Sequence, residues 1–195
     1  MDAVLTMELQ RGVCGDLASF AALRDEVADR DIATAAGRLC AAARAAARPV
    51  VHCTFSLRAD RSGTDLAIPL MWAARKDPEY LLQHTAACEL MPQLGQQAAD
   101  HLCDRHHGVS PFGGTDLHAR LRALGVSGVV IAGVSLNVGV IGTAIEAVNL
   151  GYRVTVASDA VAAVPNDYGL AVLRNSVAAI AVVQTVEEVI TRWAV

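Results

Sequence analysis

The acidic side chain best placed for chemistry near the start of the chain is Glu8. It follows the apolar stretch at residues 3–7, which has the length and composition of a buried strand. A carboxylate just past such a strand is partly withdrawn from water, which suits it to general acid or base work. A solvated glutamate in a turn and a salt-bridge partner are the structural alternatives, and the local sequence leaves all three open.

A second site for chemistry lies where residues 129–132, an apolar run rich in valine and isoleucine, end at Gly133. Helix-period apolar residues begin three positions later. Open α/β sheets bind ligands at such strand-to-helix junctions, because free backbone N–H groups and the positive end of the helix dipole point there. Ser135, Asn137 and Gly139 occupy this junction. Ser135 is not part of a G-x-S-x-G elbow, and the glycines match neither a dinucleotide fingerprint nor a P-loop.

A third group of candidates, Arg105, His106 and His107, follows a short apolar stretch. An imidazole at a strand end can orient a substrate or move a proton, and a surface histidine pair is an equally good interpretation. We also considered a metal site that would add His101 and Cys103. Its spacing matches no standard zinc pattern, so we predict no metal.

Length and composition limit the protein classes. A chain of 195 residues with 53% hydrophobic content suits one well-buried domain, predicted to span residues 1–195. The net charge is −4 and basic residues do not cluster, which argues against nucleic acid and membranes as partners. Five widely spaced cysteines, no recognisable signal peptide and no apolar stretch of transmembrane length predict free thiols in the cytoplasm.

The elements that must position these residues alternate between strand and helix. We predict strands at residues 3–7, 50–55, 102–106, 126–132, 153–157 and 180–183, and helices at 18–47 (broken near 30), 79–88, 116–124, 136–150, 167–178 and 186–193. This alternation indicates an α/β protein in which helices cover both faces of a parallel sheet. His52, inside the second strand, is interpreted as a core histidine with satisfied hydrogen bonds. Residues 57–80 form a long loop, in which Trp72 and Tyr80 either roof a pocket or, as we prefer, form a subunit contact.

Several motifs together resemble the isochorismatase-like hydrolases over nearly the whole chain. They are ELQ at 8–10, SPFGGTDL at 110–117, LRALG at 121–125, GVSLNVG at 133–139, AVNLGY at 147–152 and DA at 159–160. The resemblance implies a Rossmann-like three-layer fold with a six-stranded, mostly parallel sheet of order 3-2-1-4-5-6. It further implies a cis peptide at Val134–Ser135 and a homodimer or homotetramer.

The cysteine-hydrolase branch of this family, which includes nicotinamidases, uses an Asp, a Lys and a nucleophilic Cys. All three positions differ here. Glu8 stands at the Asp position, His106 or (with a one-residue slip) Arg105 at the Lys position, and Gly139 at the Cys position. Without a thiolate no acyl-enzyme forms, so amide hydrolysis by the family's usual route is predicted to be absent.

The isochorismatase branch proper resembles this chain in carrying Gly at that position. Those enzymes protonate a vinyl ether, and water then attacks the resulting cation. The resemblance therefore implies a hydrolase without cofactor or metal, acting on a small metabolite, with isochorismate-type vinyl ethers as the best single guess. The predicted catalytic residues are Glu8 and His106, and the predicted substrate-binding residues are Gln10, Arg58, Arg105, Phe112, Ser135, Asn137 and Gly139.

Two alternatives remain. One is a catalytically inactive family member that binds a small molecule or serves as a partner subunit. The other, weaker, is a non-hydrolytic role in a biosynthetic pathway of secondary metabolism.

Overall fold

Six parallel strands form the centre of the computed structural model, which describes residues 1–194. Their order is β3-β2-β1-β4-β5-β6, as the resemblance predicted, and every neighbouring pair is parallel. The strands are β1 (Asp2–Met7), β2 (Val50–Phe55), β3 (His101–Arg105), β4 (Gly128–Gly133), β5 (Arg153–Val161) and β6 (Val182–Gln184). The central strands β1, β2 and β4 are buried almost throughout, which explains their nearly continuous apolar sequences.

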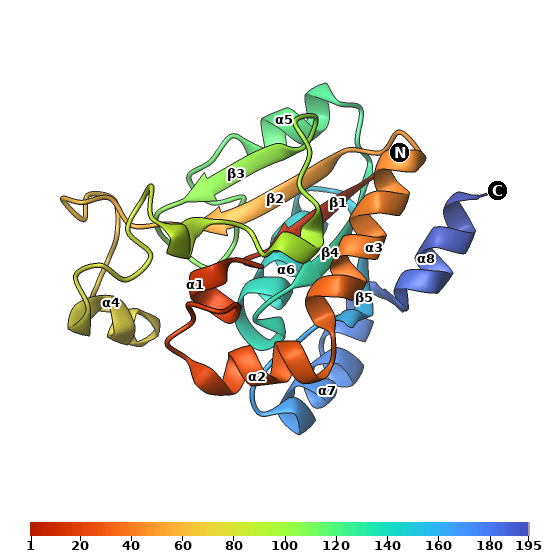
Figure 1. The fold of residues 1–195 in the computed structure, drawn as a ribbon. Coiled ribbons are helices and arrows are strands. Elements are labelled where there is room, and N and C mark those ends of the chain that lie inside the picture. The colour runs from red at the N-terminus through yellow and green to blue at the C-terminus, as the bar shows by residue number, and fades with distance from the viewer. Residues whose placement is uncertain (195) are drawn as a thin grey trace.

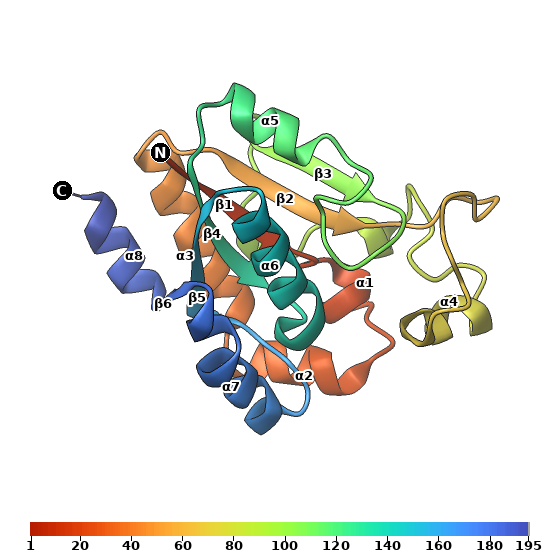
Figure 2. The ribbon, with the colours of Figure 1, turned by 180° about the vertical axis from the view of Figure 1, so that it is seen from behind.

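Helices cover both faces of the sheet (Figures 1 and 2). They are α1 (Arg11–Cys14), α2 (Ala21–Asp29), α3 (Ile32–Ala45), α4 (Trp72–Lys76), α5 (Leu117–Ala123), α6 (Ile141–Asn149), α7 (Asn166–Asn175) and α8 (Val186–Trp193). One apolar core joins the sheet to α2, α3 and α8, and a second joins it to α5, α6 and α7. The predicted three-layer α/β/α architecture is confirmed.

The predicted helix at residues 79–88 is wrong. The segment forms turns and ends in a short 3₁₀ helix, Ala86–Cys88. Leu57 explains this difference, because its N–H donates to the carbonyl of Leu81 and its own carbonyl accepts from Gln83. This pairing with the chain beyond β2 uses backbone groups that a helix would need.

The connection between β2 and β3 extends beyond the rest of the molecule and carries α4 (Figures 1 and 2). A small third apolar cluster, which includes Phe55, Leu57, Met71 and Leu81, joins this connection to the end of β2. No helix in residues 1–194 is both long and apolar enough to span a membrane.

His52 is a satisfied core histidine, as predicted. Its ring is fully buried, with Nδ1 2.8 Å from the Thr6 hydroxyl and Nε2 3.2 Å from the Asp100 carboxylate. Asp100 also pairs with Arg44 at 2.7 Å. Burial lowers the pKa of His52 below its usual 6.5, and the nearby Arg44 charge acts in the same direction, while the bond to Asp100 opposes them.

We therefore expect the unfolding free energy to fall as the pH drops below about 6.5. There the unfolded chain binds a proton that folded His52 binds only at lower pH, which adds a slope of up to about 1.4 kcal/mol per pH unit. Urea unfolding between pH 7.5 and 5 measures this slope. It should be smaller in His52→Gln and unchanged in the control His84→Gln, whose side chain is exposed. Equal slopes in all three proteins would refute the assignment to His52.

Candidate active site

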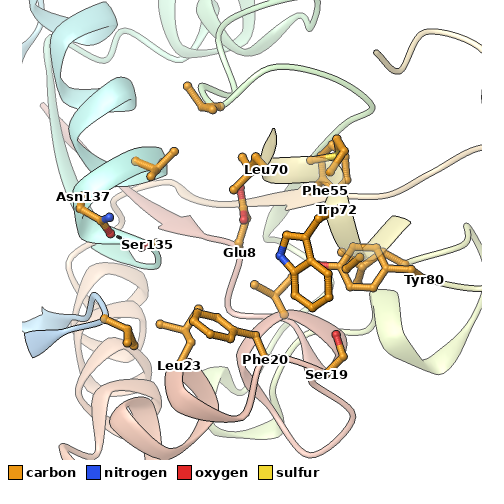
Figure 3. Close-up of a pocket in the computed structure, with 18 of the residues that line it drawn as sticks. Glu8, Ser19, Phe20, Leu23, Phe55, Leu70, Trp72, Tyr80, Ser135 and Asn137 are labelled. Atoms are coloured by element: carbon orange, nitrogen blue, oxygen red, sulfur yellow. Dashed lines mark hydrogen bonds between the residues drawn. The ribbon is translucent and has the colours of Figure 1, made fainter. Parts of the chain in front are cut away.

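A cavity of about 240 Å³ lies at the carboxyl ends of the central strands (Figure 3). Its floor includes Glu8 after β1, Arg105 at the end of β3, and the turn that follows β4. Most of the remaining lining is apolar. These lining residues are Val13, Phe20, Leu23, Phe55, Leu70, Met71, Trp72, Ala73, Leu81, Val109, Val138 and Val164. A small polar centre inside an apolar wall is typical of a site for a small organic ligand.

The polar centre of the cavity is an ion pair between Glu8 and Arg105. Glu8 has a positive φ of 48°, and its N–H donates to the carbonyl of Cys53 at 2.9 Å, which fixes it at the end of β1. The Arg105 residue is 4% exposed, and its guanidinium donates to the carbonyl of Thr54 and lies 5.3 Å from the centre of the Phe55 ring. Its Nε–H has no partner among the described residues. A positive charge held this way offers an anionic ligand a fixed contact.

The turn after β4 supplies the opposite side of the floor. Residues Leu136–Val140 form one turn of π-helix that leads directly into α6. The predicted cis peptide at Val134–Ser135 is present, and the Ser135 hydroxyl donates to the side-chain oxygen of Asn137. π-Helical turns inside longer helices are frequent at functional sites.

Gly139 faces Glu8 across this floor. A Cβ atom added to Gly139 would lie 3.7 Å from Glu8 Oε1, 3.5 Å from Met7 Cε and 3.3 Å from the carbonyl of Val134. A side chain here would therefore project beside the carboxylate, into space that glycine leaves for a ligand.

Arg105, rather than His106, faces Glu8 in the structure. The Nδ1 atom of His106 lies 2.9 Å from the carbonyl of Ser56, and His106 is absent from the cavity lining. Arg58 also lies outside the lining, where it donates to the carbonyl of Ser62 at 3.0 Å and stabilises its own loop. The geometry thus gives neither His106 a catalytic position nor Arg58 a substrate contact.

Gln10 and Phe112, both predicted to bind substrate, are packed into the protein outside the cavity. The Gln10 amide donates to the carbonyls of Phe55 and Cys88 and accepts from the N–H of Phe55 at 2.8 Å. Phe112 belongs to the core that includes α5 and α6, and its ring stacks on Tyr152 with centroids 6.0 Å apart. Both residues therefore have structural roles. Gln10 fixes the end of β2, and Phe112 fills the core beside α5 and α6.

The aromatic wall of the cavity was only partly visible in the sequence. Phe20, Phe55, Trp72 and Tyr80 all line it, although they come from three separate parts of the chain. Trp72 and Tyr80 were noted as a pocket roof or a subunit contact, and the structure places both at the cavity. The subunit contact that we preferred stays a prediction. The occurrence of Trp72 and Tyr80 in an otherwise irregular loop was the sequence feature that pointed to this wall.

None of the five cysteines in residues 1–194 lines the cavity. Cys14 comes near to it, with Sγ 3.6 Å from the carbonyl of Glu8, but the residue is buried behind the floor. Burial, with the Glu8 charge acting in the same direction, raises the pKa of Cys14 to about 12. Such a thiol stays protonated at neutral pH and is a poor nucleophile.

A profile of the isochorismatase domain matches residues 2–188. The chain belongs to the isochorismatase family. The isochorismatase family protein YecD of Escherichia coli O157:H7 is 32% identical over 194 residues, which cover 96% of this chain and 94% of YecD.

Solved structures of isochorismatase-like proteins are similar to this chain over nearly its whole length. A cysteine hydrolase from Pseudomonas syringae pv. phaseolicola 1448A superposes with a TM-score of 0.82 at 26% identity, covering 99% of this chain and 92% of the other. An isochorismatase family protein from Burkholderia thailandensis gives a TM-score of 0.80 at 25% identity, covering 100% and 96%. By family and fold, the chain is an isochorismatase-like hydrolase.

Proposed function

We propose that this isochorismatase-like hydrolase acts on a small metabolite by a route that uses no cysteine, with Glu8 as the general acid. The observation that carries the proposal is the floor of the cavity. There a carboxylate faces a glycine, and the described lining includes no thiol. An isochorismate-type vinyl ether is the substrate class that this arrangement fits best.

The chemistry starts with a proton on Glu8. Glu8 gives it to the terminal carbon of the enol ether, and water adds to the adjacent cationic carbon while returning a proton to the Glu8 carboxylate. The resulting hemiketal breaks its C–O bond and releases pyruvate and a ring alcohol, so that one water is consumed in total. Gly139 leaves the space in which the ether group and the water would meet.

Arg105 is the positive group that would bind a carboxylate of the substrate. Its guanidinium belongs to the cavity lining and is already fixed by Glu8 and Thr54, so it offers a substrate carboxylate a preorganised positive charge.

The alternative function is a non-catalytic binding protein or partner subunit. One observation supports it: Glu8 pairs with Arg105 and Ser135 with Asn137, so these four polar groups already have protein partners. Assembly into a homodimer or homotetramer also remains a prediction.

The test of the proposed function is pyruvate release. We expect the purified protein to release pyruvate from isochorismate or from its amino analogue. A coupled lactate dehydrogenase assay measures the pyruvate. Treatment of the native protein with iodoacetamide should leave the rate unchanged, because no thiol takes part. No release from either substrate would remove this substrate class and favour the binding protein, and inactivation by iodoacetamide that substrate prevents would contradict the non-cysteine route.

A further inference from the structure

Tyr80 is a partly buried residue of the cavity to which the proposed mechanism gives no role. It lines the wall formed by the β2–β3 connection and is labelled in Figure 3 on the opposite side of the cavity from Ser135 and Asn137. Its ring packs against the third apolar cluster beside Phe55 and Leu81. The side chain is therefore placed by packing on both the strand end and the loop.

The backbone around Tyr80 is held in place, although it belongs to a long connection. Its N–H donates to the carbonyl of Asp77 at 3.2 Å. The next residues pair with the chain beyond β2, where Leu57 donates to Leu81 at 2.8 Å and accepts from Gln83 at 2.9 Å. Groups fixed by such pairing keep their direction toward a ligand without a large loss of conformational entropy on binding.

The Tyr80 hydroxyl makes no hydrogen bond to another side chain or to the backbone within residues 1–194, and the partly buried Tyr80 side chain lines the cavity. Burial, with the nearby Glu8 charge acting in the same direction, raises the pKa of Tyr80 to about 12. The phenol thus keeps its proton at neutral pH and is available as a donor.

The cavity also limits what the hydroxyl can meet. At about 240 Å³ it is smaller than sites for drug-sized ligands, and the rings of Phe20, Phe55 and Trp72 line it. A small ring fits such a wall, and Arg105 beneath it suits a carboxylate on that ring. A donor at one side of the cavity then selects rings that carry an oxygen acceptor.

We propose that the Tyr80 hydroxyl donates a hydrogen bond to a ring oxygen of the substrate and selects hydroxylated ring carboxylates over unsubstituted ones. The inference rests on the proposed function for its substrate class. It adds a specificity-determining residue on the side of the cavity away from the junction after β4.

A binding measurement tests this inference without turnover. Benzoate and the 2-, 3- and 4-hydroxybenzoates serve as probes in isothermal titration calorimetry with the wild type, Tyr80→Phe and the control Tyr168→Phe, whose ring is exposed on α7. We expect the wild type to bind at least one hydroxybenzoate about three- to tenfold more tightly than benzoate. This preference should disappear in Tyr80→Phe and persist in Tyr168→Phe.

Kinetics give a second measurement if pyruvate is released. Tyr80→Phe should raise KM for isochorismate about three- to tenfold with kcat within twofold of the wild type, because a bond made equally in ground and transition states affects binding alone. The inference is overturned if the wild type shows no preference among the four probes, or if Tyr80→Phe retains it. Absence of pyruvate release with a lost preference in Tyr80→Phe would refute the proposed reaction and keep the role of Tyr80.

Discussion

Glu8→Gln is expected to lower kcat for pyruvate release by about a hundred- to ten-thousand-fold, the usual contribution of a positioned general acid. Glutamine has the shape of glutamate and can still accept a hydrogen bond from Arg105, but it has no proton to give to the enol ether. Glu8 lies on the cavity floor, and its carboxylate is near the space left by Gly139. The variant therefore removes the acid and leaves the site otherwise filled.

Glu89→Gln is the matched control for this variant. Glu89 also pairs with an arginine, Arg11, at 2.8 Å, but its side chain is 62% exposed and lies outside the cavity. It should keep wild-type kcat. Glu8→Asp should retain more activity than Glu8→Gln, since aspartate tolerates the positive φ of this position and keeps an acid that is one methylene shorter.

Stability has to be measured beside activity, because Glu8→Gln leaves the buried Arg105 charge without its counterion. Urea unfolding shows which variants are folded under assay conditions. A folded Glu8→Gln protein that still releases pyruvate within tenfold of the wild-type rate would exclude Glu8 as the general acid.

Gly133→Ala is expected to prevent folding, with a loss of more than about 4 kcal/mol in unfolding free energy. Gly133 ends β4 with a φ of 112°, a conformation that side-chain-bearing residues rarely adopt. A Cβ atom there would lie 2.1 Å from the carbonyl oxygen of Met7 and 2.7 Å from its nitrogen. Both atoms belong to the backbone of β1, so the clash cannot be relieved without separating two central strands.

Gly125→Ala separates the two causes of the expected stability loss in Gly133→Ala, which are the positive φ and the clash with β1. Gly125 also has a positive φ, 69°, but a Cβ atom there meets no atom within 4 Å. Its loss should be about 1 kcal/mol, from backbone conformation alone. Soluble yield and urea unfolding compare the two variants, and similar losses would mean that the contact with β1 contributes little.

The candidate active site depends on the same contact between the ends of β1 and β4. The N–H of Val134 donates to the carbonyl of Met7 at 2.9 Å, immediately before Glu8, and the N–H of Leu136 donates to the carbonyl of Ala162 at 2.7 Å. These bonds set the turn that carries Ser135, Asn137 and Gly139 against the end of β1. Stability and chemistry therefore share one close approach between β1 and β4.

The sequence by itself determined the six strands, most of the helices and their order along the chain. Continuous apolar runs are typical of strands covered on both faces, and the glycines and polar residues that interrupt them lie at the turns. These signals are local, so they predicted the six strands, the break between α2 and α3, and the place of the junction. The family motifs then predicted the strand order and the cis peptide, which residue patterns alone do not specify.

Only the tertiary structure decided which polar residues share the cavity. Consecutive residues at a strand end point in opposite directions, so that Arg105 turns toward Glu8 while His106 turns to Ser56. An uncertainty of one residue in matching the family's Lys position was enough to exchange Arg105 and His106 in the sequence-based prediction. Gln10 follows Glu8 by two positions, and its amide bonds to the end of β2 instead of facing the cavity.

The aromatic wall and the irregular segment at residues 79–88 also depended on tertiary structure. Phe55, Trp72 and Tyr80 meet because the long β2–β3 connection packs on the end of β2, and such long-range packing leaves no periodic signal in the sequence. The apparent helix at 79–88 gave way to pairing with Leu57 for the same reason. Backbone hydrogen bonds to a distant strand end outweighed the local preference for helix.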